Sequence, residues 1–104
     1  MKPLQYYIDN DQVTKFVEYA GDRLQHFSNK DVWDLITVLA YELAHSAADE
    51  VAGFVRMTET RDLLCLGYHD NLEIALYIFD GVGRAEAKAL LMGLTTIACY
   101  GGHL

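Results

Sequence analysis

The stretch RDLLCLGYHDNLEIALYIFDG, from Arg61 to Gly81, decides the fold class because its apolar residues fit two different periods. At helical spacing it gives two short helices, with Gly67 as a stop and with Asp70 and Glu73 as a new capping pattern. At a period of two it gives a β-hairpin turned at residues 70 and 71, with one strand face formed by Leu72, Ile74, Leu76 and Ile78. Leucine outnumbers β-branched residues here, and the start and stop signals agree with helices, so the helical interpretation is favoured.

The region before this stretch predicts two longer helices. Asp9 stands as an N-cap with Gln12 three residues later, and helical spacing then continues as far as Phe27 through Val13, Phe16, Val17, Ala20 and Leu24. A second capping pattern begins at Ser28 with Asp31, followed by an apolar stripe of Val32, Leu35, Ile36, Leu39, Leu43 and Ala47. Because the connection is short, the two helices are expected to form an antiparallel hairpin.

The last part of the chain predicts one further helix. Gly81 and Gly83 interrupt the chain, AEAKALLMGLTTIACY follows at residues 85–100, and Gly101 ends the helix. No charge occurs from residue 89 to residue 100, yet this run is shorter than the roughly 20 residues that span a bilayer. The helix is therefore expected in the centre of the core or at a subunit interface. A two-fold homodimer is expected to associate through Leu90, Leu91, Leu94 and Ile97.

Together these patterns predict one all-α domain over residues 1–104. It is a small bundle of about five helices built on the N-terminal antiparallel hairpin, with residues 1–8 as an N-terminal arm. The alternative is an α+β fold in which residues 62–79 form a β-hairpin.

Composition limits the classes of partner. Fifteen acidic residues against eight basic ones give a net charge of −7, which disfavours direct binding to nucleic acid or to anionic membranes and favours a basic protein partner. The sequence shows neither an apolar secretory signal nor a bilayer-spanning run, so a cytoplasmic location is expected. Cys65 and Cys99 are then expected as reduced thiols buried in the core.

One segment has the spacing of a metal site. YELAHSAADE, residues 41–50, places Glu42, His45 and Asp49 on one side of a helix, where a Glu-x-x-His unit could hold a metal ion. The chain has only one such unit, and the row lies away from the apolar stripe, so a solvated charged face or contact with a second chain is expected. The helix before it carries a similar outward row of Glu18, Asp22 and His26.

No catalytic constellation or cofactor motif is assembled in the sequence, so neither enzymatic activity nor a cofactor is expected. The aromatic residues Tyr6 and Tyr7 on the arm and Trp33 on the second helix are instead candidate partner-binding residues, together with Glu42, His45 and Asp49. The sequence therefore favours a small acidic protein that sterically inhibits or sequesters another protein, as an inhibitor, anti-activator, immunity or anti-defence factor. The alternative is a small metal-dependent enzyme whose site forms across a dimer.

Overall fold

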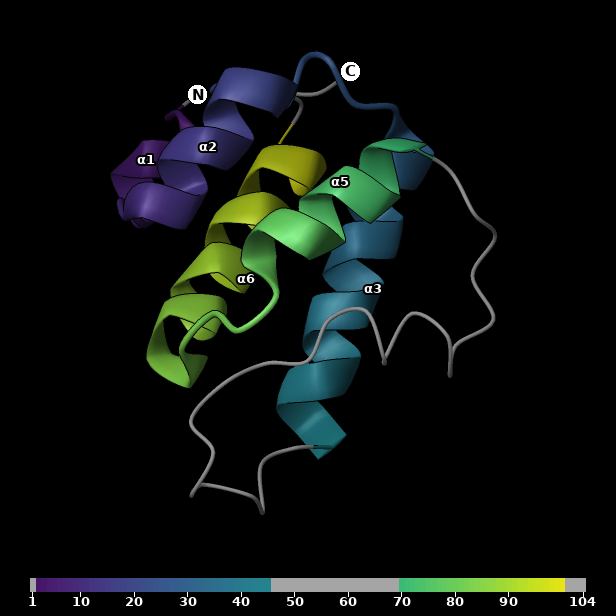
Figure 1. The fold of residues 1–104 in the computed structure, drawn as a ribbon. Coiled ribbons are helices and arrows are strands. Elements are labelled where there is room, and N and C mark those ends of the chain that lie inside the picture. The colour runs from purple at the N-terminus through teal and green to yellow at the C-terminus, as the bar shows by residue number, and fades with distance from the viewer. Residues whose placement is uncertain (1, 46–69, 101–104) are drawn as a thin grey trace.

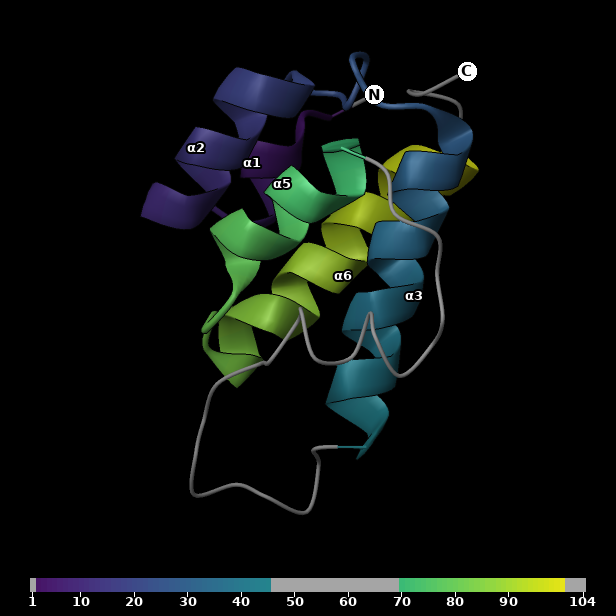
Figure 2. The same ribbon diagram turned by 45° about the vertical axis from the view of Figure 1, so that its right-hand side comes forward.

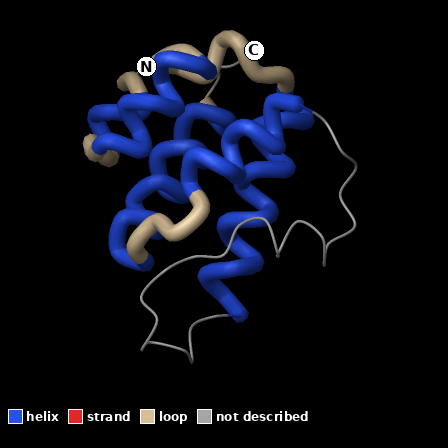
Figure 3. The backbone as a smooth tube through the Cα atoms, viewed as in Figure 1, coloured by secondary structure: helices blue, strands red, loops and turns tan. Residues whose placement is uncertain are grey.

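The computed structural model describes residues 2–45 and 70–100, and both ranges are helical (Figures 1 and 3). The helices are α1 (Leu4–Tyr7), α2 (Asp11–Ala20), α3 (Asn29–His45), α5 (Asp70–Phe79) and α6 (Arg84–Cys99). No strand occurs in these two ranges, so the all-α prediction is confirmed. The β-hairpin alternative is wrong for residues 70–79, while residues 62–69 lie outside the described part.

Helix α2 starts one residue later and ends earlier than the sequence predicts. Its N-cap is Asn10, whose Oδ1 accepts a hydrogen bond of 2.8 Å from the Val13 N–H. It ends at Ala20 because Gly21 has a φ of +94°, outside the helical region. Leu24 has a φ of +61°, and this turn still buries Leu24 and Phe27. The apolar spacing thus predicted the right buried residues but the wrong backbone beyond Ala20.

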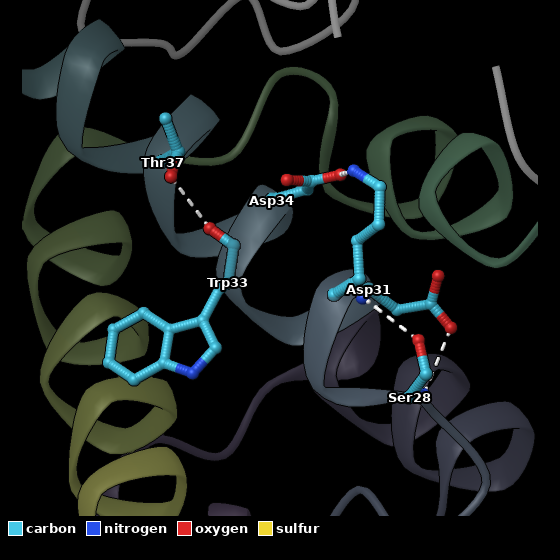
Figure 4. Close-up of polar contacts among 6 residues, drawn as sticks. Ser28, Asp31, Trp33, Asp34 and Thr37 are labelled. Carbon is cyan, nitrogen blue, oxygen red and sulfur yellow. Dashed lines mark hydrogen bonds and ion pairs between the residues drawn. The ribbon is translucent and has the colours of Figure 1, made fainter. Parts of the chain in front are cut away.

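Helix α3 begins with the capping box that the sequence predicts. The Ser28 N–H donates to Asp31 Oδ2 at 3.0 Å, and the Asp31 N–H donates to Ser28 Oγ at 3.1 Å (Figure 4). The stripe residues Val32, Leu35, Ile36 and Leu39 are buried, Leu43 is half-buried, and Ala47 lies outside the described residues.

Helices α2 and α3 do not form the predicted hairpin. Helix α2 packs against α1 and α5, whereas α3 packs against α5 and α6. In Figures 1 and 2 the ribbons of α5 and α6 lie between α2 and α3. The left-handed turn at Gly21 and Leu24 redirects the chain, and Phe27 packs edge-on against Phe16 of α2 with 5.4 Å between ring centroids. A short connection therefore does not make these two helices neighbours.

Helix α6 contributes one buried face to the core. It packs against α1 and α3 and buries Ala87, Leu90, Gly93, Leu94 and Ile97. Of the four residues expected at a dimer interface, Leu90, Leu94 and Ile97 are fully buried within the chain, and Leu91 is partly buried. These three side chains pack inside one chain and are not on its surface.

The N-terminal arm is docked on its own chain. The Leu4 side chain is fully buried and its N–H donates to the Asp22 carbonyl at 2.8 Å. The arm rests on α6 at Gly93, where an added Cβ would lie 2.9 Å from Leu4 Cδ1 and 3.0 Å from Tyr7 Cβ. Glycine at position 93 is what allows α1 to approach the α6 backbone so closely.

Across residues 2–45 and 70–100, no helix has both the length and the apolar character that a membrane crossing requires.

Candidate functional site

The structure describes only part of the predicted row of Glu42, His45 and Asp49. Glu42 is buried with 8% of its surface exposed, so the prediction that it faces outward is wrong. It follows Leu39 by three residues and Leu35 by seven, and therefore shares their buried side of α3, which packs against both α5 and α6. His45 is the last residue of α3, and Asp49 lies outside the described residues.

The second acidic row is also divided. Because α2 ends at Ala20, Asp22 and His26 lie in the following turn and not on the helix of Glu18. The Asp22 carboxylate accepts from Gln25 Nε2 at 3.3 Å, and the His26 N–H donates to the Ala20 carbonyl at 2.9 Å. Within the described ranges, no group of three or more histidine, cysteine, aspartate or glutamate side chains is placed to hold a metal ion.

The aromatic candidates Tyr6 and Trp33 are exposed, whereas Tyr7 packs inward on Gly93. Tyr6 is 64% exposed, and Lys2 Nζ lies 4.6 Å from its ring centroid. Trp33 is 41% exposed, and in Figure 4 its indole extends on the side of α3 that faces α6. Both side chains are thus available to a partner, while Tyr7 holds the arm to its own chain.

Helices α2 and α5 carry an exposed apolar surface that the sequence interpretation missed. They pack antiparallel: Tyr19 Oη near the end of α2 donates to Asn71 Oδ1 at 2.8 Å, and Gln12 Nε2 near its start donates to the Ile78 carbonyl at 3.1 Å. Tyr77 is 82% exposed, and Tyr19 and Ile74 are also exposed. We call Tyr19, Ile74 and Tyr77, with the exposed carboxylates of Glu18 and Asp70, the α2/α5 surface.

A signal for this surface was present in the sequence. Asp70, Ile74 and Tyr77 follow each other at steps of four and three residues, which places them on one helix face. The buried face of α5 consists of Leu72, Ala75, Leu76 and Phe79. The outward face can be identified only once the segment is known to be helical, and short apolar runs do not decide between helix and strand.

The charges around the α2/α5 surface are mainly negative. The two helices contain the carboxylates of Asp11, Glu18, Asp70 and Glu73, and their only basic residue is Lys15. In contrast, α6 contains two basic residues, Arg84 and Lys88, and a single carboxylate, Glu86. The negative charge of the chain is therefore distributed unevenly over its helices.

A polar network holds the α2/α5 surface in place. Asn71 receives the hydrogen bond from Tyr19, and its Nδ2 donates to Asp31 Oδ2 at 2.9 Å. Asp31 is buried and also forms the capping box of α3 with Ser28. The contacts from Tyr19 through Asn71 to Asp31 connect α2, α5 and α3. These hydrogen bonds therefore hold the helices that carry the exposed side chains in place.

The described cysteine is not in the core. Cys99 is a free thiol on the exposed side of α6, so the prediction that it is buried is wrong, and Cys65 lies outside the described residues. Position 99 follows the buried Ile97 by two residues, which places it on another side of the helix.

Comparison with models of protein families, with curated proteins and with solved structures finds no match for this chain. What the chain can do is therefore inferred from the geometry and the charge of its described residues.

Proposed function

We propose that the chain acts by binding another protein and covering part of that partner's surface. The observation that carries the proposal is the exposure of aromatic side chains, which are Tyr6, Tyr19, Trp33, Tyr77 and Tyr100. Tyrosine and tryptophan dominate the energetic centres of protein interfaces, because they bury a large apolar area with little loss of side-chain entropy. In this proposal they anchor a partner, and the mechanism is steric inhibition or sequestration.

The net charge of −7 supports a protein partner with a basic surface. A negative surface accelerates the encounter with a basic protein and slows the approach of nucleic acids and anionic membranes. An inhibitor, anti-activator, immunity or anti-defence factor fits this description, since each acts by occupying a surface on its target.

The proposal includes a cytoplasmic location and a homodimer. Leu90, Leu94 and Ile97 are occupied within the chain, so a dimer has to use other residues. Light scattering over a concentration series measures the oligomeric state, and a constant monomer mass would remove the dimer from the proposal.

Co-purification followed by reconstitution tests the function. The tagged chain is recovered from cells of its natural source, a co-eluting protein is identified, and the complex is rebuilt from purified components. We expect a complex of defined stoichiometry that blocks an activity or an assembly of the partner. A Lys88→Ala variant is a matched control, because Lys88 is exposed and its replacement removes no aromatic or acidic group. A chain that is always recovered without a protein partner would contradict the proposal.

A further inference from the structure

We propose that the α2/α5 surface is the docking site for a basic amphipathic segment of a partner protein. This segment carries lysine or arginine beside one or two apolar side chains. The inference rests on the proposed function and adds to it a location and a partner chemistry. Tyr77, Ile74 and Tyr19 supply the apolar contact, and Glu18 and Asp70 supply the charge.

The apolar side chains gather on one surface. Ile74 and Tyr77 are three residues apart on α5, and Tyr19 stands on α2, which packs against α5. The Tyr19 hydroxyl bonds Asn71 on the turn of α5 that precedes Ile74, so Tyr19 is fixed near that helix. A partner that covers Tyr77 therefore has Ile74 beside it on the same face of α5 and Tyr19 on the neighbouring helix.

Charge complementarity identifies the occupant. Asp70 is exposed at the start of α5, and Glu18 is exposed on α2, about 100° around the helix from Tyr19. Lys15, three residues before Glu18, is the one basic residue of these two helices. Helix α5 contains no basic residue, so an approaching lysine or arginine meets no cation along it. A second copy that docked through its own α2/α5 surface would present the same negative charges and be repelled, so the charge pattern favours a basic protein over a two-fold homodimer formed by this surface.

The two helices that carry the surface are anchored to the rest of the chain, which lowers the cost of binding. The Tyr19, Asn71 and Asp31 contacts connect α2, α5 and α3, and Leu72, Leu76 and Phe79 anchor α5 in the core. When the helices that carry an interface are already held in place, less conformational freedom is lost as a partner docks. A basic amphipathic helix that lays its apolar side over Ile74 and Tyr77 places its cations against Glu18 and Asp70.

A synthetic probe tests this chemistry directly. The probe is a labelled helical peptide of about 14 residues, or four turns, with leucines on one face and lysines on the other. Two control peptides replace lysine by glutamate or scramble the order so that the leucines no longer share a face. Fluorescence anisotropy at physiological salt should show binding of the first peptide only. Equal binding of the scrambled peptide would overturn the inference, because charge alone would then explain it.

Matched variants locate the binding. Tyr77→Ala should weaken binding of the leucine–lysine peptide about tenfold, as expected for an interface anchor. Asp70→Asn should weaken it less and reduce its dependence on salt. Met92→Ala removes another exposed apolar side chain, from α6, and should leave binding within about twofold. Thermal unfolding checks that every variant is folded, and equal losses for Tyr77→Ala and Met92→Ala would overturn the assignment.

Tyr77→Ala and a further variant, Trp33→Ala, separate this inference from the proposed function. If a natural partner is lost with Trp33→Ala and retained with Tyr77→Ala, the protein-binding function stands and the α2/α5 surface is wrong. If Tyr77→Ala releases the partner and Trp33→Ala does not, the inference is supported. If neither the wild-type chain nor any variant is recovered with a protein partner, the proposed function itself fails.

Discussion

Single residues carry unusual backbone geometry in the turn after α2. Leu24 combines a φ of +61° with a completely buried side chain. For a residue with a Cβ, the left-handed region costs about 1–2 kcal/mol, and burial of the leucine side chain offsets this cost. Helical spacing of apolar residues cannot reveal such a turn, because the spacing records which residues are buried and not the backbone that buries them.

Replacement of Leu24 should reverse the usual order of alanine and glycine. Leu24→Ala should lower the free energy of unfolding by about 2–4 kcal/mol, because it leaves a cavity and keeps the backbone strain. Leu24→Gly loses the same side chain but relieves the strain, so it should be the less destabilised of the two variants. Chemical denaturation measures both values. A more stable alanine variant would contradict a left-handed residue at this position.

Asp31 should be energetically coupled to its capping partner. Ser28→Ala and Asp31→Ala each break the capping box, and Asp31→Ala also leaves the Asn71 amide without that acceptor. Each should lower the free energy of unfolding by about 1–3 kcal/mol, with Asp31→Ala the larger. In a double-mutant cycle, the combined loss should be smaller than the two losses added together. Strict additivity would mean that the two side chains act independently.

At the level of elements, start and stop signals were more informative than spacing. The capping box of α3 and the glycines before α6 were predicted where the structure has them. The pairing of helices was not, since loop length does not specify which faces meet once a left-handed turn redirects the chain. Glu42 was misplaced for a related reason: a helix between two neighbours buries more than one stripe, and a single helix pattern does not show the second neighbour.

The contact of α1 with α6 should depend on the absence of a side chain at Gly93. In Gly93→Ala the new Cβ meets Leu4 and Tyr7, so α1 has to move away from α6. Hydrogen exchange of the Leu4 amide should accelerate, because its bond to the Asp22 carbonyl depends on this docking. Amides in α3 and α5 serve as the internal control and should keep their protection. Unchanged exchange at Leu4 would show that the arm tolerates the added methyl group.

At the level of the whole molecule, buried and exposed positions should respond differently to the same added charge. Leu94→Asp introduces a charge at a fully buried position and should unfold the chain, since a buried unpaired charge costs several kcal/mol. Tyr77→Asp introduces the same charge at an exposed position and should leave the fold intact. Circular dichroism and light scattering distinguish these outcomes. A folded monomer for Leu94→Asp would instead indicate that this residue lies at an interface.

The sequence predicted the fold class of the molecule but only part of its candidate surface. Tyr6 and Trp33 were selected as aromatic residues outside the apolar stripes, and both are exposed. Tyr77 was overlooked because its exposure depends on how α5 is rotated against α2 and α3, which is a property of tertiary packing. Charge totals were readable from composition, whereas their uneven distribution over the helices required the arrangement in space.

The docking of Leu4 against Gly93 also has a consequence for synthesis on the ribosome. Helix α1 packs against α6, which lies far along the chain from it, so this contact cannot form until α6 has left the exit tunnel. Contacts between residues so distant along the chain slow folding, because a large loop has to close before they contribute. Helix α1 is synthesised before α6 but completes its packing only after it, and a nascent chain that stalls before α6 leaves the α6-facing side of Leu4 open to chaperones and proteases.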